Sequence, residues 1–243
     1  MSKQLIFNFP FKKNYLKQDF YVSKNNFNAF KLIESWPKWP SRLVNIFGPK
    51  GCGKTHLINI LKIKIDSVVV LSKNISRDIL KEYKTRECLV IDDFYNDIDE
   101  KTLYSIINQA YQDNKYLIIS SPNSIKNIQT KIKDLESRFR SFVDIGIDLP
   151  TDELIRVILT KNFSDKQIQV SEKNIEYILK NIERSYEKIN TFSNSIDSLS
   201  LTKAQPIKLH LIKKVLKFIY FKYYFSDLIF SAFALTSSML PTK

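Results

Sequence analysis

The residues best suited to chemistry in this 243-residue chain lie in the segment Gly48-Pro-Lys-Gly-Cys-Gly-Lys-Thr55, which follows the apolar run Leu43–Phe47. The segment fits the pattern G-x-x-x-x-G-K-[ST], in which backbone N–H groups close around phosphate oxygens, the lysine reaches the β and γ phosphates and the hydroxyl binds Mg²⁺. A helix expected to begin at about Lys54 adds the positive end of its dipole. The sequence therefore predicts a phosphate site formed by Gly48, Pro49, Lys50, Gly51, Cys52, Gly53, Lys54 and Thr55.

A second chemical element is Leu89-Val-Ile-Asp92-Asp93, an apolar run that ends in two carboxylates. After a complete phosphate loop, a carboxylate at Asp92 is expected to hold Mg²⁺ opposite Thr55, and Asp93 to orient an attacking water. Paired acids at a strand end can also simply open a turn. The predicted metal residues are Thr55 and Asp92.

Composition is that of a globular protein, with 44% hydrophobic and 26% charged residues. The net charge of +13 would suit nucleic acid, because a basic surface gains affinity for a polyphosphate by releasing counterions. However, 31 lysines against 7 arginines is also what an AT-rich coding sequence produces. Cys52 and Cys88 show neither disulfide nor metal spacing, and no secretory leader is recognisable, so the expected location is the cytoplasm.

Elements that would position these residues alternate between strand and helix from Leu43 to Leu149. Short apolar runs rich in β-branched residues predict strands buried on both faces of a parallel sheet: Leu43–Phe47, Val68–Leu71, Leu89–Ile91, Tyr116–Ile119 and Val143–Ile147. Helices are expected at about Lys54–Ile65, Ser76–Tyr83, Glu100–Asp113 and Ser124–Arg138. This is a doubly wound α/β pattern, with ligands at the carboxyl ends of the strands.

After Pro150 the pattern becomes helical, with segments that open at Thr151, Ser171 and Glu183 and a further helix, Ile207–Ile219, that Pro206 would start. We expect four parts: a peptide (residues 1–12), a nucleotide-binding α/β domain (13–150), a helical lid domain (151–217) and an apolar tail (218–243).

These motifs together resemble the AAA+ ATPases of the DnaA group, and more narrowly the Hda-type regulators of replication initiation in their alphaproteobacterial form. The resemblance covers almost everything from Gln4 to about Leu216. It rests on the combination of the phosphate loop with four further stretches: Thr55-His-Leu57, Asp19-Phe-Tyr-Val-Ser23, Trp36-Pro-Lys-Trp-Pro40 and Glu183-Arg-Ser185, the last followed by Gln205-Pro-Ile207. It implies an AAA+ P-loop ATPase core with a five-stranded parallel sheet, followed by a small all-α lid domain.

The resemblance also implies roles for individual residues. Lys54 and Thr55 bind phosphate and Mg²⁺, and Asp92 is the Walker B carboxylate. Asp93 stands where most AAA+ proteins carry the catalytic glutamate, so intrinsic hydrolysis is expected to be weak. The sensor I residue is Ser120 or Ser121, of which Ser121 is counted among the expected cofactor-binding residues.

Two arginines complete the implied set. Arg138 matches the arginine finger, which a neighbouring AAA+ subunit receives at its γ-phosphate; the alternative is a surface ion pair with Asp134 one helical turn away. Arg184 matches sensor II, through which a lid reads the nucleotide; the alternative is a cation on a helix surface. The residues expected to be catalytic are thus Asp93 and Arg138.

The segment Gln4-Leu-Ile-Phe-Asn-Phe9 is similar to the peptide with which Hda proteins bind the replicative sliding clamp. An extended peptide can seat Leu5, Phe7 and Phe9 in an apolar groove while Gln4 makes a directional hydrogen bond. An N-terminal edge strand is the alternative. DnaA also carries a helix-turn-helix domain beyond its lid, whereas a short tail follows Val215 here, so an initiator is not expected.

The sequence thus predicts a protein that binds ADP or ATP with Mg²⁺, docks on the clamp and promotes hydrolysis of ATP held by the DnaA initiator, contacting DNA mainly indirectly and without a membrane. Self-association is possible. A helicase loader or transposition-type ATPase that binds single-stranded DNA is the alternative from another class. A pure adaptor that holds nucleotide structurally is the third. The tail Phe218–Leu235 is expected to be an extra lid helix or an interface, with membrane contact as its alternative.

Overall fold

The computed structural model describes residues 15–203 and 206–221, which form two compact units divided between Pro150 and Thr151. The peptide Gln4–Phe9 and most of the apolar tail lie outside the described residues. No helix of the described ranges is both long and apolar enough to cross a membrane.

The first unit is built on one parallel sheet with the strand order β2-β3-β4-β1-β5. Its strands are β1 (Leu43–Phe47), β2 (Ser67–Leu71), β3 (Cys88–Asp92), β4 (Tyr116–Ser121) and β5 (Val143–Gly146). Its helices are α1 (Phe27–Glu34), α2 (Lys54–Lys62), α3 (Ile79–Thr85), α4 (Glu100–Gln112) and α5 (Lys133–Arg140), with 3₁₀ turns η1 (Lys17–Asp19), η2 (Ser72–Asn74) and η3 (Ile125–Asn127). The predicted fold class is confirmed, as each expected strand run is a strand of the sheet.

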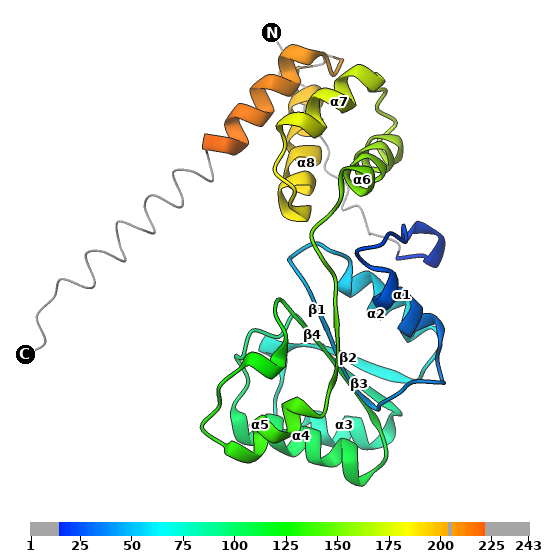
Figure 1. The fold of residues 1–243 in the computed structure, drawn as a ribbon, viewed down its shortest axis with the longest axis vertical. Coiled ribbons are helices and arrows are strands. Elements are labelled where there is room, and N and C mark those ends of the chain that lie inside the picture. The colour runs from blue at the N-terminus through cyan, green and yellow to red at the C-terminus, as the bar shows by residue number, and fades with distance from the viewer. Residues whose placement is uncertain (1–14, 204–205, 222–243) are drawn as a thin grey trace, which may run out of the picture. The chain divides into compact units, whose positions relative to one another are not determined.

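Helices cover both faces of this sheet: α1 and α2 lie on one side, and α3, α4 and α5 on the other (Figure 1). Successive strand side chains point to opposite faces. Leu89 and Ile91 therefore join the cluster formed with α3, α4 and α5, whereas the buried Val90 between them does not. Burial on both faces explains why the strands read as continuous apolar runs.

In its described residues the second unit consists of helices joined by loops: α6 (Asp152–Asp165), α7 (Glu172–Asn181), α8 (Tyr186–Lys203) and a helix over residues 209–221. They share an apolar cluster that includes Ile155, Phe192 and Ile212. Thr151 caps α6 by accepting a hydrogen bond from the Leu154 N–H (3.3 Å).

Several helix predictions differ from the structure. Helix α2 ends at Lys62 rather than Ile65, and α3 spans Ile79–Thr85 rather than Ser76–Tyr83. The helix expected from Pro206 begins at residue 209 instead. The single helix expected over Ser124–Arg138 is divided into η3 and α5, because a side chain of α4 takes backbone donors between them. Glu100 accepts the N–H groups of Lys131 (3.0 Å) and Ile132 (3.1 Å), which an unbroken helix would have used internally.

The polar side chain of Asn45, on β1, is fully buried inside the sheet unit. Its amide nitrogen donates to the Ile119 carbonyl (3.0 Å) and to Ser121 Oγ (2.8 Å), and its oxygen accepts the Ile125 N–H (3.2 Å). Asn45 thus connects β1 to the carboxyl end of β4 and to η3, using both ends of its amide.

We expect Asn45→Val to lower the free energy of unfolding of this unit by about 2 kcal/mol, because it leaves buried partners without hydrogen bonds. Both tryptophans, Trp36 and Trp39, lie in the same unit, so denaturant unfolding followed by their fluorescence measures the change. Asn127→Ala, at an exposed position of η3, is the matched control and should shift the midpoint little. An unchanged midpoint for Asn45→Val would contradict the assigned role.

Candidate functional site: the phosphate loop and its carboxylates

The phosphate loop turns the chain from the end of β1 into the start of α2. Gly51 (φ 83°) and Gly53 (φ 101°) both adopt left-handed backbone, which side chains other than glycine disfavour. A Cβ on Gly53 would also lie 2.9 Å from Phe20 Cε2. The Gly48 N–H donates to the Ser121 carbonyl (3.1 Å), so the loop begins against the end of β4.

Lys54, the first residue of α2, is only 8% exposed although it carries a charge. Its ammonium donates to the carbonyl oxygens of Gly48 (2.6 Å) and Pro49 (3.2 Å), both of which are neutral. A buried cation with neutral acceptors favours an anion beside it, since burial of a charge costs free energy unless an opposite charge compensates it. These observations fit a bound polyphosphate.

Cys52 lies within the same loop and is buried, with its sulfur 4.0 Å from Lys54 Nζ. Burial raises the pKa of the Cys52 thiol, and the neighbouring Lys54 only partly offsets this. The thiol therefore stays protonated and serves as a packing group in the loop.

Asp92, the last residue of β3, connects the end of the loop to the neighbouring strand β4. Thr55 Oγ1 donates to Asp92 Oδ2 (2.9 Å), and the Ser120 hydroxyl donates to Asp92 Oδ1. The same Ser120 Oγ accepts the Asp93 N–H (3.0 Å). A hydroxyl and a carboxylate in contact at this edge are oxygen groups of the kind that Mg²⁺ prefers, and Thr55 and Asp92 would be the residues to hold it.

Asp93 differs from its neighbour in environment. It is exposed and adopts a positive φ of 62°, while Asp92 is 5% exposed. The turn begins at Asp93, and Phe94 then donates its N–H to the Ser120 carbonyl (2.8 Å).

The two serines at the end of β4 face different partners, which the sequence did not distinguish. Ser120 contacts Asp92 and Asp93, whereas the Ser121 hydroxyl accepts from Asn45 and donates to the Asn123 carbonyl (2.7 Å). The contacts therefore favour Ser120, rather than the expected Ser121, as the polar group beside the carboxylates. Neither Asn45 nor Phe20 was recognised from sequence, although a lone asparagine inside an apolar strand was an available signal.

Arg138 lies near the end of α5, outside the cluster formed by Lys54, Thr55, Asp92, Asp93 and Ser120. Its guanidinium carbon lies 4.5 Å from the centre of the Tyr111 ring. The ion pairs of the described residues do not include the alternative pair between Arg138 and Asp134. Tyr111, at the end of α4, was not anticipated.

Arg184 belongs to the second unit and precedes α8 by two residues, rather than lying within a helix. Its guanidinium forms a two-pronged ion pair with Asp152, with Nε 2.9 Å and a terminal nitrogen 3.0 Å from the two carboxylate oxygens. Both side chains are more than half exposed, so the pair contributes little to stability.

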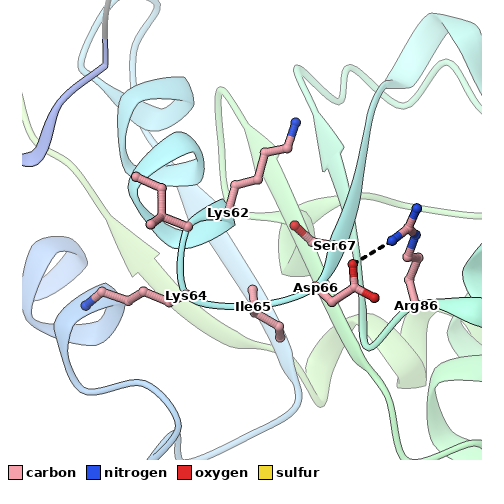
Figure 2. Close-up of a pocket in the computed structure, with 7 residues that line it drawn as sticks. Lys62, Lys64, Ile65, Asp66, Ser67 and Arg86 are labelled. Atoms are coloured by element: carbon pink, nitrogen blue, oxygen red, sulfur yellow. Dashed lines mark hydrogen bonds and ion pairs between the residues drawn. The ribbon is translucent and has the colours of Figure 1, made fainter.

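A pocket of about 500 Å³ lies elsewhere on the first unit, between the end of α2 and the beginnings of β2 and β3 (Figure 2). In a parallel sheet this edge is opposite to the carboxyl ends where the phosphate loop lies. Arg86 points to Asp66 in the pocket and pairs with it (2.7 Å). The pocket is therefore separate from the candidate site.

Sequence comparisons place this chain near DnaA proteins. A family model described as RNA helicase matches residues 44–135. The chromosomal replication initiator protein DnaA of Buchnera aphidicola subsp. Baizongia pistaciae is 28% identical over 88% of this chain and 52% of its own length. DnaA of Borreliella burgdorferi is 25% identical over 86% of this chain and 48% of its own length. The chain spans about half the length of these curated relatives.

Solved structures share the fold. Domain III of the Thermotoga maritima replication initiation protein DnaA matches with a TM-score of 0.71 and 18% identity over 87% of this chain and 99% of that chain. The replication initiator DnaA bound to AMPPCP and single-stranded DNA matches with a TM-score of 0.62 and 17% identity over 75% and 64% of the two chains. Thermotoga maritima RuvB, a Holliday junction branch migration motor, matches at 0.55 and 20% identity over 72% and 61%. The fold is that of the AAA+ P-loop ATPases.

We expect Lys54→Ala to abolish measurable binding of ADP and ATP, a loss of about a hundred-fold or more, because the buried cation that would face the phosphates is removed. Isothermal titration calorimetry measures the affinity. Lys62→Ala, at the exposed end of the same helix, is the control and should bind normally. Unchanged affinity of Lys54→Ala would mean that the loop is not the nucleotide site.

Proposed function

We propose that this DnaA-like AAA+ chain binds ADP or ATP with Mg²⁺ and acts on a second AAA+ protein, the DnaA initiator, by offering Arg138 to the ATP that DnaA holds. Hydrolysis of that ATP would switch initiation off, which makes the chain a negative regulator of DNA replication initiation of the Hda type. The observation that carries the proposal is the position of Arg138: it lies on the surface of α5, away from the chain's own phosphate loop, and contacts an aromatic ring instead of an acid.

The chain's own nucleotide would be held by the phosphate loop. Lys54 would offset phosphate charge, Thr55 and Asp92 would hold Mg²⁺, and Ser120 would orient the Asp92 carboxylate through its hydrogen bond. Mg²⁺, when bound, adds positive charge at the phosphates. Asp93 has a side chain one methylene shorter than the usual glutamate, so we propose slow hydrolysis in this chain's own site, with nucleotide serving mainly to fix its conformation.

Action in trans requires only that a guanidinium reach the partner's phosphate. The planar guanidinium offers five N–H donors in one plane and can grip two phosphate oxygens at once. An arginine finger supplied in trans raises phosphoryl-transfer rates by about 10³–10⁵. Arg138 is half-buried and contacts the Tyr111 ring, which limits the conformations open to its side chain.

We also propose that Gln4, Leu5, Phe7 and Phe9 dock on the DNA polymerase sliding clamp, which would bring the chain to DNA without a direct DNA site. We further propose that Arg184 acts as sensor II, through which the lid reads the bound nucleotide. This role would require the Arg184 guanidinium to leave Asp152.

A second candidate function, a loader or transposition-type ATPase that binds single-stranded DNA, is favoured by the net charge of +13. It predicts direct, salt-sensitive binding to single-stranded DNA without the clamp. Fluorescence anisotropy with labelled single-stranded DNA at two salt concentrations distinguishes the two functions.

We expect the double variant Gln4→Ala with Leu5→Ala to lose clamp binding while it keeps nucleotide affinity and thermal stability, because the peptide would act as a separate docking segment. Surface plasmon resonance on immobilised clamp measures binding, and a thermal melt provides the control. A matching loss of stability would instead indicate an edge strand of the folded body.

Arg138→Ala should cut the stimulation of DnaA-bound ATP hydrolysis by about a hundred-fold or more, while ADP affinity and clamp binding stay unchanged. Arg138→Lys should fail as well, because lysine keeps the charge but lacks the planar fork. The measurement is phosphate release from ATP-loaded DnaA in the presence of clamp and DNA, with Arg140→Ala, an exposed neighbour on the same helix, as the matched control. Full stimulation by Arg138→Ala would refute the arginine-finger role and leave the function of a pure adaptor.

A further inference from the structure

Tyr111 lies in the last turn of α4, directly beside Arg138 of α5. The guanidinium carbon is 4.5 Å from the ring centre, well within the range of a cation–π contact. The Tyr111 side chain is 41% exposed, so the ring is not simply a core residue. Part of the ring is instead contacted by one charged side chain, that of Arg138.

The ring itself is fixed by hydrogen bonds at its far end. The Tyr111 hydroxyl lies 2.6 Å from Ser141 Oγ and donates to it, and Ser141 Oγ in turn donates to the Arg138 carbonyl (2.6 Å). Ser141 also ends α5, with its N–H directed to the same carbonyl (3.1 Å). The phenol and the arginine are therefore joined twice, once through the ring face and once through the backbone of α5.

The start of α5 is tied to the same helix, α4. Glu100, the first residue of α4, accepts two N–H groups of the segment that leads into α5, those of Lys131 and Ile132. Leu135 and Phe139 pack α5 into the cluster shared with α4. The position of Arg138 is thus determined by α4 at both ends of α5.

A guanidinium stacked on a ring keeps its hydrogen-bonding capacity. When a guanidinium lies flat on a ring, the ring contacts its face and the N–H donors point outward in the guanidinium plane. The same group can therefore rest on Tyr111 and bind phosphate oxygens with its edge. Stacking also restricts the Arg138 rotamers before the partner binds. Less side-chain entropy is then lost on docking, which is the benefit of preorganisation.

We propose that Tyr111 is a positioning residue, which holds the Arg138 guanidinium in the orientation that a partner's phosphate receives. The inference rests on the proposed function, because it assigns Tyr111 to the same arginine. Tyr111 does not touch the phosphate itself; it acts through Arg138.

The test compares Tyr111→Leu, which removes the ring, with Tyr111→Phe, which keeps the ring and removes only the hydroxyl. Phosphate release from ATP-loaded DnaA with clamp and DNA is measured as this protein is titrated. Tyr111→Leu should lower the maximal stimulation about two- to five-fold, as expected for an exposed cation–π contact, without changing the concentration that gives half-maximal stimulation. Tyr111→Phe should retain most of the maximal stimulation. Tyr220→Leu removes another exposed tyrosine ring, in the helical unit, and is the control.

A second measurement needs no partner. In ¹⁵N-edited NMR spectra the Arg138 Nε–H signal, assigned with Arg138→Lys, should be shifted by the ring in the wild type and in Tyr111→Phe, and lose this shift in Tyr111→Leu. Stimulation unchanged in Tyr111→Leu, or lost equally in the Phe and Leu variants, would overturn the positioning role. If the wild type does not stimulate DnaA at all, the proposed function fails, and an absent ring shift in the wild type would separately refute the stacking.

Discussion

The candidate site depends on the placement of β4 between β3 and β1. At the carboxyl end of β4, the Ser120 side chain binds the Asp92 carboxylate of β3, and the Ser121 carbonyl accepts the first N–H of the phosphate loop that leaves β1. A shift of β4 by one residue would exchange the faces of these serines and separate both contacts. The strand order therefore sets the geometry of the phosphate loop relative to its carboxylate.

Asn45 supports that placement from inside the sheet. A polar side chain in a fully buried strand is destabilising unless both its donor and its acceptor are used, and here they are used on β4 and η3. The hydrogen bonds also fix the register of a strand whose other side chains are apolar. In β1 the hydrogen bonds of Asn45 thus specify the register, whereas the apolar side chains contribute burial.

Helix α4 links the core to the surface on which Arg138 lies. Its middle residues, such as Ile106 and Ile107, are fully buried against the sheet. Glu100 at its start and Tyr111 in its last turn contact the two ends of α5. The packed helix α4 therefore also fixes the position of Arg138 on α5. The second unit is organised differently, around its own apolar cluster and the exposed pair of Arg184 with Asp152.

The sequence by itself determined the phosphate loop, the strand-ending carboxylates and the α/β class, because each depends on residues that are close in the chain. The glycines before Lys54 and Thr55 determine the backbone conformation of the loop locally. Apolar runs without alternation identify strands buried on both faces. The observed strands differ from the predicted ranges by at most two residues at an end.

Tertiary structure alone decided which partners meet across strands and helices. It distinguished Ser120 from Ser121, because their directions depend on the register of β4 with its neighbours. It divided the helix expected over Ser124–Arg138, since Glu100, thirty-one positions away from Lys131, takes the backbone donors there. It also brought Tyr111 to Arg138 through helix packing. These contacts join residues far apart in sequence, and no local propensity or spacing encodes such a pairing.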